Sequence, residues 1–183
     1  MRSDAFVKPG YRFFTILRIL ISVVPILFPI AGCRRLPCIL RRLVPPGLHR
    51  IMLIVSGVGV AAALMTKGAP HFKAAVSVAP VIDLSTYQTI SVERWMGFLE
   101  DNPQGYAEVN LINYADQLQG DLPLIHGSVN ENVEFAFTLQ FTNALIAKNK
   151  KSNMMVYPNR HHVIRDAQLH VFTKISHYFF DKL

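Results

Sequence analysis

The chain has 183 residues, of which 51% are hydrophobic and 17% are charged, with a net charge of +7 at pH 7. This size fits one globular domain with a full core and leaves little room for a second. Residues 1–50 hold nine Lys or Arg residues and the single acid Asp4, so they carry +8 and the remainder −1. The basic charge is therefore not spread over a folded face, and no nucleic-acid partner is expected.

The two cysteines, Cys33 and Cys38, both lie in this basic segment. They form no disulfide framework, and no histidine lies at a spacing that would complete a metal site. We therefore expect neither a metal nor another cofactor. The composition break near residue 50 divides the chain into a basic, apolar segment, 1–50, and a second region, 51–183.

Residues 13–31 are mostly apolar but contain an arginine and two prolines, and they are followed by IAGC, ending at Cys33. This layout is typical of a bacterial lipoprotein signal, although the arginines that follow oppose translocation. The uncharged run 19–33 has 15 residues, against the ~20 that a membrane span needs. We interpret the stretch as an apolar leader without a defined role. A signal, or weak membrane contact through 13–31, remains an alternative, so periplasmic, membrane-associated and cytoplasmic locations stay open.

From residue 51 onward, short apolar runs alternate with helix-forming segments. Strands are predicted at 51–55, 72–78, 122–125 and 153–157. Helices are predicted at 61–67 and 167–183, with helical pieces over 83–119 punctuated by Gly97, Pro103 and Gly105. A further amphipathic helix is predicted over 133–149. Its expected core residues are Phe135, Leu139, Phe141, Leu145 and Ile146.

This alternation predicts an α/β fold with a mostly parallel sheet flanked by helices. Ligand sites of such sheets lie at the carboxyl ends of the strands. Three of those ends carry chemistry-capable residues: Ser56, the loop 128–131, and the pair His161 and His162. Serine, an acid-type loop and histidine follow one another in the chain order of an α/β-hydrolase triad.

Four segments carry a more specific signal: TKGAPHFKAAVSVAPV (66–81), VERWMG (92–97), LIHGSVNENVEF (124–135) and VYPNRHH (156–162). In this order and spacing, they closely resemble the C-terminal part of the catalytic domain of prolyl oligopeptidase family serine peptidases, in the dipeptidyl-peptidase-IV-like branch. The resemblance implies that 51–183 is a partial α/β-hydrolase fold whose first strands are missing, and that 1–50 is unlike the family.

The resemblance also implies a catalytic triad, whose members depart from the family pattern. Ser56 stands for the nucleophile in IVSGVGV, a degraded form of the glycine-rich elbow, and Val55 is the alternative match. Asn130 occupies the place of the catalytic acid, with Glu131 as a neighbouring substitute. His162 matches the catalytic base. The family glycine after that base is a valine here, and an unusual backbone angle at that valine would cost about 1–3 kcal/mol.

On the substrate side, the resemblance implies an apolar cup for a penultimate proline. Val81, Tyr87 and Val133 would contribute to it, and Asn132 would contact a substrate carbonyl oxygen. Two aromatic members of the cup are replaced by Leu84 and Ser91, which predicts a wider and less aromatic pocket.

Two functional interpretations follow. The first is an impaired serine peptidase that releases dipeptides or cleaves after proline, with a peptide as its substrate. The second is a catalytically inactive C-terminal fragment or pseudoenzyme that acts, if at all, by pairing with a full-length relative or with a second copy of itself. Simpler structural roles are also open: Ser56 as a helix N-cap, Asn130 as a turn former, and His126 as a packed histidine.

Overall fold

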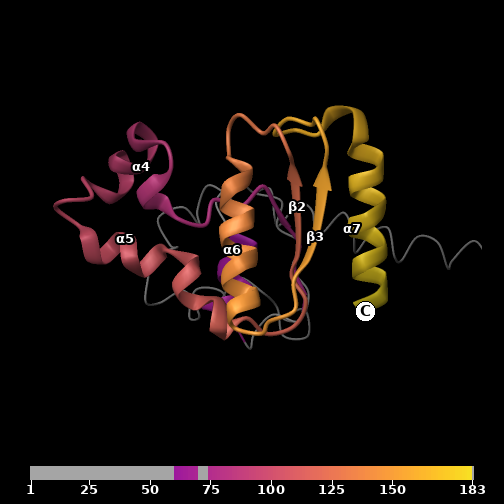
Figure 1. Ribbon diagram of the computed structural model, residues 1–183, viewed down its shortest axis with the longest axis horizontal. Helices are drawn as coiled ribbons and strands as arrows, with labels where there is room; N and C mark the ends of the chain where they lie inside the picture. The colour runs from indigo at the N-terminus through magenta and orange to yellow at the C-terminus, as the bar shows by residue number, and fades with distance from the viewer. Residues whose placement is uncertain (1–59, 70–73, 183) are drawn as a thin grey trace, which may run out of the picture.

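The structure, a computed structural model, describes residues 60–69 and 74–182 (Figure 1). The predicted strand 51–55, the apolar stretch 13–31 and Ser56 lie outside the described residues. The described helices and strands follow one another as α3 (Val60–Thr66), β1 (Ser77–Val78), η2 (Leu84–Thr86), α4 (Thr89–Met96), α5 (Pro103–Val109), η3 (Leu111–Gln117), β2 (Pro123–Gly127), α6 (Phe135–Ala147), β3 (Asn153–Tyr157), η4 (Arg165–Ala167) and α7 (Gln168–Lys182).

The three described strands form one parallel sheet in the order β1-β2-β3. The strand predicted at 72–78 contributes only two residues to it, together with an isolated bridge between Ala74 and Asp121. It ends where Ala79 takes a left-handed φ of 47° and Pro80 follows. A proline has no N–H to donate to a sheet ladder, so the strand cannot continue there.

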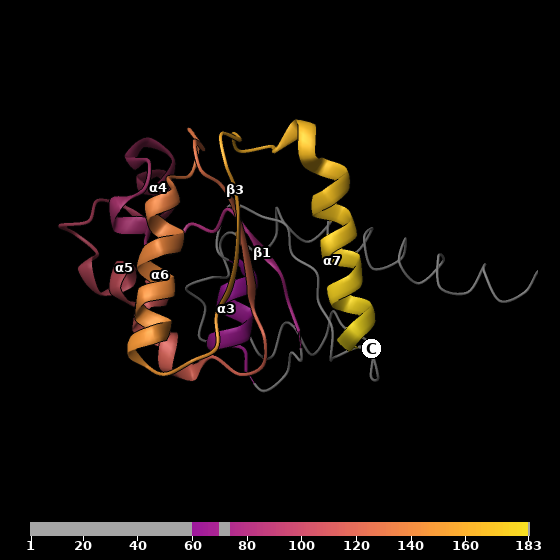
Figure 2. The ribbon, with the colours of Figure 1, turned by 45° about the vertical axis from the view of Figure 1, so that its right-hand side comes forward.

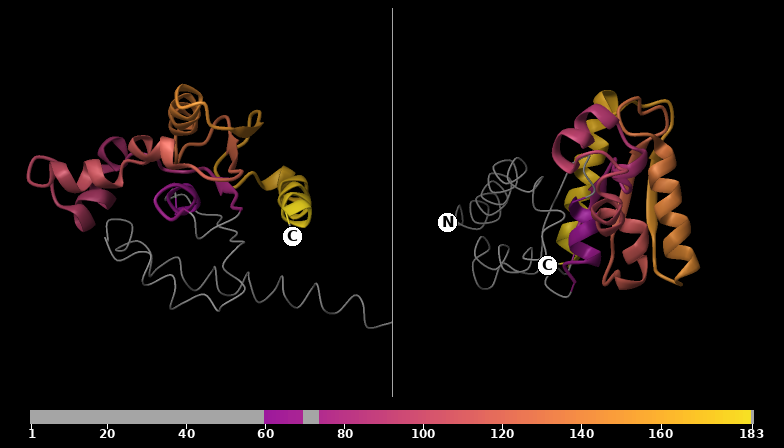
Figure 3. Two further views of the ribbon diagram at one scale, coloured as in Figure 1. Left: turned by 90° about the horizontal axis from the view of Figure 1, so that it is seen from below. Right: turned by 90° about the vertical axis from the view of Figure 1, so that its left-hand side faces the viewer.

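Helices cover the sheet on both faces. In Figures 1 and 2, α6 and α7 lie on opposite sides of the strands, and the view from below in Figure 3 agrees. Successive residues of a strand point to opposite faces. Leu124 of β2 accordingly joins a cluster with α3 and α6, whereas Ile125 joins a second cluster with α7. The fold is therefore the layered α/β arrangement that the sequence predicts.

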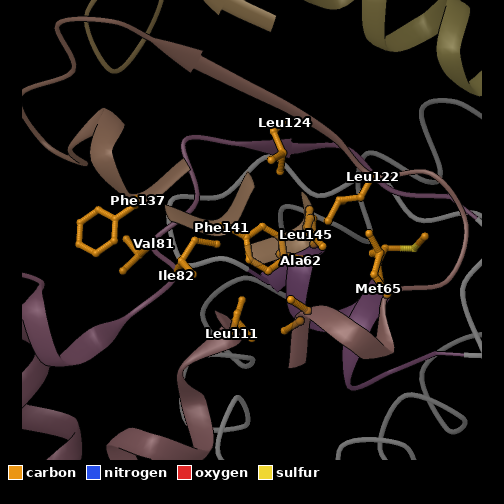
Figure 4. Close-up of a cluster of buried hydrophobic side chains, with 14 of the residues drawn as sticks. Ala62, Met65, Val81, Ile82, Leu111, Leu122, Leu124, Phe137, Phe141 and Leu145 are labelled. Carbon is orange, nitrogen blue, oxygen red and sulfur yellow. The ribbon is translucent and has the colours of Figure 1, made fainter. Parts of the chain in front are cut away.

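The larger cluster is built around Phe141 and Leu145 of α6, both 0% exposed. Figure 4 shows these two side chains between Leu124 of the sheet and the labelled residues of α3, Ala62 and Met65. The alanines of α3 present little bulk, which lets this helix pack closely against its neighbours. The cluster holds α3, α6 and the sheet together beneath the carboxyl ends of the strands.

The prediction of the core face of α6 is partly wrong. Phe141 and Leu145 are buried as expected, but Leu139 is 46% exposed, Ile146 is 67% exposed and Phe135 is only half-buried. Phe137 and Thr138 are buried in their place. Apolar residues surround this helix on most sides, so the sequence period alone does not select the packed face. Phe137, Phe141 and Leu145 follow one another at intervals of four, and Thr138 lies three residues before Phe141.

The helical pieces over 83–119 are confirmed, but two of the expected breaks act differently. Asn102 caps α5 with its side chain, which accepts a hydrogen bond from the Gly105 amide at 3.1 Å, and Pro103 follows it in the first turn. Proline is favoured at that position because its missing N–H has no helical partner there. Pro103 therefore starts a helix, and Gly105 lies inside it.

Adjacent substitutions on α6 test this corrected face. Leu145→Ala is expected to lower the free energy of unfolding by about 2–5 kcal/mol, because it removes fully buried methyl groups and leaves a cavity. Ile146→Ala, one position along on the exposed face, is expected to change it by only about 0.5 kcal/mol. Urea denaturation monitored by circular dichroism measures both values. Equal losses for the two variants would contradict the packing described here.

Candidate active site

The loops that follow β2 and β3 lie side by side, because the two strands are parallel neighbours that end together at the pair Gly127 and Tyr157. The Ser128 amide donates to the Tyr157 carbonyl oxygen at 3.0 Å, and the Val129 amide donates to the Arg160 carbonyl oxygen at 3.2 Å. The Ser128 hydroxyl accepts from the Asn159 amide at 2.8 Å. These bonds hold residues 128–130 against residues 158–162, as the carboxyl-end rule predicts.

Gly127 permits this close approach. A β-carbon at this position would lie 2.7 Å from the His161 carbonyl oxygen and nearer still to that of Arg160. Both are backbone atoms, so neither can rotate away. The glycine of the His-Gly pair is therefore required by the neighbouring loop.

Asn130 is buried at the centre of the site, with 7% of its surface exposed. Its side-chain oxygen accepts from the backbone amides of Asn132, at 3.0 Å, and Val133, at 2.9 Å. Its side-chain nitrogen, Nδ2, lies 3.1 Å from His162 Nδ1 and 3.1 Å from His126 Nε2. Rotating the amide by 180° would place its N–H groups against two backbone N–H donors. The backbone thus fixes which end of the amide faces the histidines.

This orientation determines the tautomer of His162. The Asn130 NH₂ group can only donate, so His162 Nδ1 must accept, and the ring hydrogen then resides on Nε2. In a serine hydrolase, the Nε2 atom of the catalytic histidine takes the proton of the nucleophile and must therefore carry a lone pair. The structure brings Asn130 and His162 together, and the amide leaves the hydrogen of the His162 ring on Nε2.

His126 is a packed histidine, as expected, with 0% of its surface exposed. Its Nδ1 lies 2.7 Å from the Thr138 hydroxyl, and its Nε2 lies 2.9 Å from the Val133 carbonyl oxygen. Burial lowers the pKa of His126 below its ordinary value, so the ring is neutral at pH 7. The sequence predicted that His126 is packed but did not predict its contact with Asn130. The two residues are four positions apart across a turn, and this spacing alone does not indicate that their side chains meet.

Glu131 points away from the position that a substitute acid would need. Its carboxylate accepts from His161 Nδ1 at 3.0 Å and from the His162 backbone amide at 3.4 Å. Its own backbone amide and the His161 ring hold the pKa of Glu131 below its usual value. The described contacts of Glu131 therefore join it to His161 and to the backbone of the histidine loop.

The strain expected at Val163 falls on another residue. Among the described residues of this loop, positive φ angles occur at Asn159 (56°) and Ile164 (50°), and Val163 is a solvent-exposed residue without one. Ile164 is buried in the cluster beneath α7. A β-branched residue in the left-handed region is strained, and packing of the isoleucine side chain offsets that cost.

The residues proposed for substrate contact are divided between the core and the surface. Val81 and Val133 are 3% and 1% exposed and belong to the larger hydrophobic cluster. Tyr87 is half-buried and lies edge-on to Phe137, with ring centroids 6.2 Å apart. Asn132 is exposed, and its side-chain oxygen lies 3.3 Å from Gln88 Nε2. Tyr87 and Asn132 are thus the two members that offer accessible surface.

Within residues 60–69 and 74–182, no three His, Cys, Asp or Glu side chains are grouped so as to hold a metal ion. No helix in the same ranges combines the length and apolar character of a membrane span. His170 and His177 of α7 are both exposed, and His170 Nδ1 lies 2.8 Å from the Tyr157 hydroxyl.

A parallel sheet with helices on both faces, whose neighbouring strands end in loops that contact one another at the carboxyl edge, is the arrangement of an α/β-hydrolase fold. Comparison with known protein families agrees with this fold class and identifies one family within it. Residues 57–183 match the model of the prolyl oligopeptidase family. The chain belongs to that family.

Individual relatives are dipeptidyl peptidases. The chain is 31% identical to dipeptidyl peptidase 4 of Bos taurus over 124 residues, which cover 65% of this chain and 16% of the relative. It is 34% identical to dipeptidyl aminopeptidase B of Saccharomyces cerevisiae over 112 residues, covering 59% and 14%. The crystal structure of Porphyromonas gingivalis dipeptidyl peptidase 4 superposes with a TM-score of 0.68 and 31% identity, over 72% of this chain and 20% of that one. This chain thus spans no more than a fifth of these relatives.

Proposed function

We propose that the chain is a dipeptidyl-peptidase-like serine peptidase whose hydrolysis of proline-containing peptides is strongly impaired by Asn130. In this proposal, Ser56 is the nucleophile and His162 is its general base. The amide of Asn130 takes the position of the catalytic acid. Tyr87 and Asn132, the accessible members of the substrate-side residues, contact the peptide.

The contact between Asn130 Nδ2 and His162 Nδ1, at 3.1 Å, carries the proposal. It preserves the spacing that an acid and a histidine need, but it presents a donor where a carboxylate would accept. An amide also fails to stabilise the imidazolium that forms when the serine loses its proton. In a serine protease, this Asp-to-Asn change lowers kcat by about 10⁴. A low residual rate is therefore expected.

A non-catalytic role is the second candidate, and the same amide favours it. A chain whose histidine cannot accept the serine proton would retain the fold and the peptide-facing surface of the family without turnover. Any function would then depend on binding, to a peptide or to another copy of a family member.

Labelling with a fluorophosphonate probe distinguishes the two candidates, because the probe reacts with an activated serine. We expect slow labelling of Ser56 in the wild type, and loss of the label in Ser56→Ala and His162→Ala. Mass spectrometry of the labelled peptide identifies the serine. If neither the wild type nor Asn130→Asp is labelled at Ser56, the peptidase proposal is wrong and the non-catalytic candidate stands.

A further inference from the structure

His126 lies on the opposite side of the Asn130 side chain from His162. Both rings approach the same atom, Asn130 Nδ2, at 3.1 Å. His126 comes from β2, and His162 comes from the loop after β3. The side chain at position 130 is therefore bracketed by two histidines, only one of which has a role in the proposed reaction.

The contacts of His126 indicate where its ring hydrogen resides. Nε2 lies 2.9 Å from the Val133 carbonyl oxygen, which can only accept, and 3.1 Å from Asn130 Nδ2, which can only donate; we assign the hydrogen to Nε2 on the shorter contact, so that Nε2 donates to Val133. Nδ1 then has a lone pair and accepts from the Thr138 hydroxyl at 2.7 Å. Because the ring is fully buried and neutral, this tautomer directs an N–H group toward Val133 and toward position 130.

Asn130 does not match this environment. Its oxygen is satisfied by the two backbone amides, but its Nδ2 brings a donor against the N–H of His126. One N–H group of Nδ2 donates to His162 Nδ1, and the other faces His126 without an acceptor, which lowers stability. A carboxylate at the same place would accept from the Asn132 and Val133 amides with one oxygen. Its other oxygen would accept from His126 Nε2. The same oxygen would also accept from His162 Nδ1 once the hydrogen of the His162 ring has moved from Nε2 to Nδ1. An ionised carboxylate has acceptor sites for four such donors.

We propose that His126 is a positioning residue, whose Nε2–H group is placed to hold a carboxylate at position 130, and that this cradle fits a carboxylate better than the amide now in it. Only the effect of this cradle on catalysis rests on the proposed function. The cradle itself is formed by β2, the start of α6 and the loop between them, and it exists whether or not Ser56 reacts.

Thermal unfolding at pH 7 tests this proposal in three backgrounds. Asn130→Asp is expected to raise the melting temperature when residue 126 is His, and also in His126→Gln, because the glutamine amide nitrogen can replace Nε2 as a donor. In the His126→Asn background, the shorter side chain cannot reach residue 130. There, Asn130→Asp is expected to lower the melting temperature. The matched control is Asn143→Asp on the exposed side of α6, which should leave the melting temperature nearly unchanged in every background.

Two results would overturn the proposal: a melting temperature that Asn130→Asp lowers equally in all three backgrounds, or a His126 ring in the wild type with its hydrogen on Nδ1. The second is measured by ¹⁵N NMR of the histidine rings and needs no variant, so it decides the matter even if the His126 variants do not fold. Coupled stability changes without fluorophosphonate labelling would preserve this inference and remove the proposed function. Fluorophosphonate labelling without coupled stability changes would preserve the proposed function and remove this inference.

Discussion

Asn130→Asp is expected to raise kcat for hydrolysis of a chromogenic Xaa-Pro substrate by about 10⁴-fold, the factor that the reverse change costs in a serine protease. The carboxylate would accept from His162 Nδ1–H and so move the lone pair to Nε2, the atom that takes the proton of the nucleophile in a serine hydrolase. It would also stabilise the imidazolium. Release of the chromophore, followed with purified wild type and variant under identical conditions, measures the ratio.

Two controls make this comparison specific. Asn143→Asp introduces the same chemical change on an exposed part of α6 and is expected to leave the rate at the wild-type level. Adding His162→Ala to Asn130→Asp is expected to remove the gain, because the carboxylate acts only through that imidazole. A gain that survives His162→Ala would show that the extra activity arises elsewhere. Equal rates for the wild type and Asn130→Asp would count against the role proposed for residue 130.

Gly127→Ala is expected to lower the free energy of unfolding by about 3 kcal/mol, as overpacking in a tight site does. The added methyl group would overlap the carbonyl oxygens of Arg160 and His161, and the histidine loop would have to move. That displacement would also lengthen the contact between Asn130 and His162. Urea denaturation measures the first effect, and the ring signals of His162 in NMR report the second.

Gly97→Ala is the matched control for this substitution. Gly97 has a φ of 74°, but no atom lies within 4 Å of the position of an added β-carbon. Its replacement should cost about 1–3 kcal/mol, because φ 74° with ψ −178° is a backbone conformation essentially restricted to glycine, but it should leave the His162 signals unchanged. If Gly127→Ala left the His162 signals as unchanged as Gly97→Ala does, the close packing of the two loops would be contradicted.

The sequence predicted the part of the fold that depends on chain order. Apolar runs such as 122–125 and 153–157 predicted β2 and β3, and the parallel arrangement then required their following loops to meet. The juxtaposition of Asn130 with His162 follows from that rule and from the family resemblance, and the structure contains it. The roles of these residues in a reaction remain predictions, and Ser56 lies outside the described residues.

Features that depend on packing could not be predicted in the same way. The apolar residues of α6 extend around the helix, so the choice of Phe137 over Leu139 as a core residue is made by the sheet and α3. The contact of His126 with position 130 depends on how the loop turns back over β2. Near His162, the left-handed backbone conformation falls on Ile164, because its side chain packs in the cluster beneath α7.

The tautomer of His162 tests the central claim most directly, because it follows from the amide of Asn130 alone. Two-dimensional ¹H–¹⁵N NMR of the histidine rings at neutral pH, with His162→Ala used to assign the signal, identifies the nitrogen that carries the hydrogen. We expect Nε2–H in the wild type and Nδ1–H in Asn130→Asp. A wild-type His162 with its hydrogen on Nδ1 would contradict the account, since the ring would then already be in the form that accepts a proton from serine.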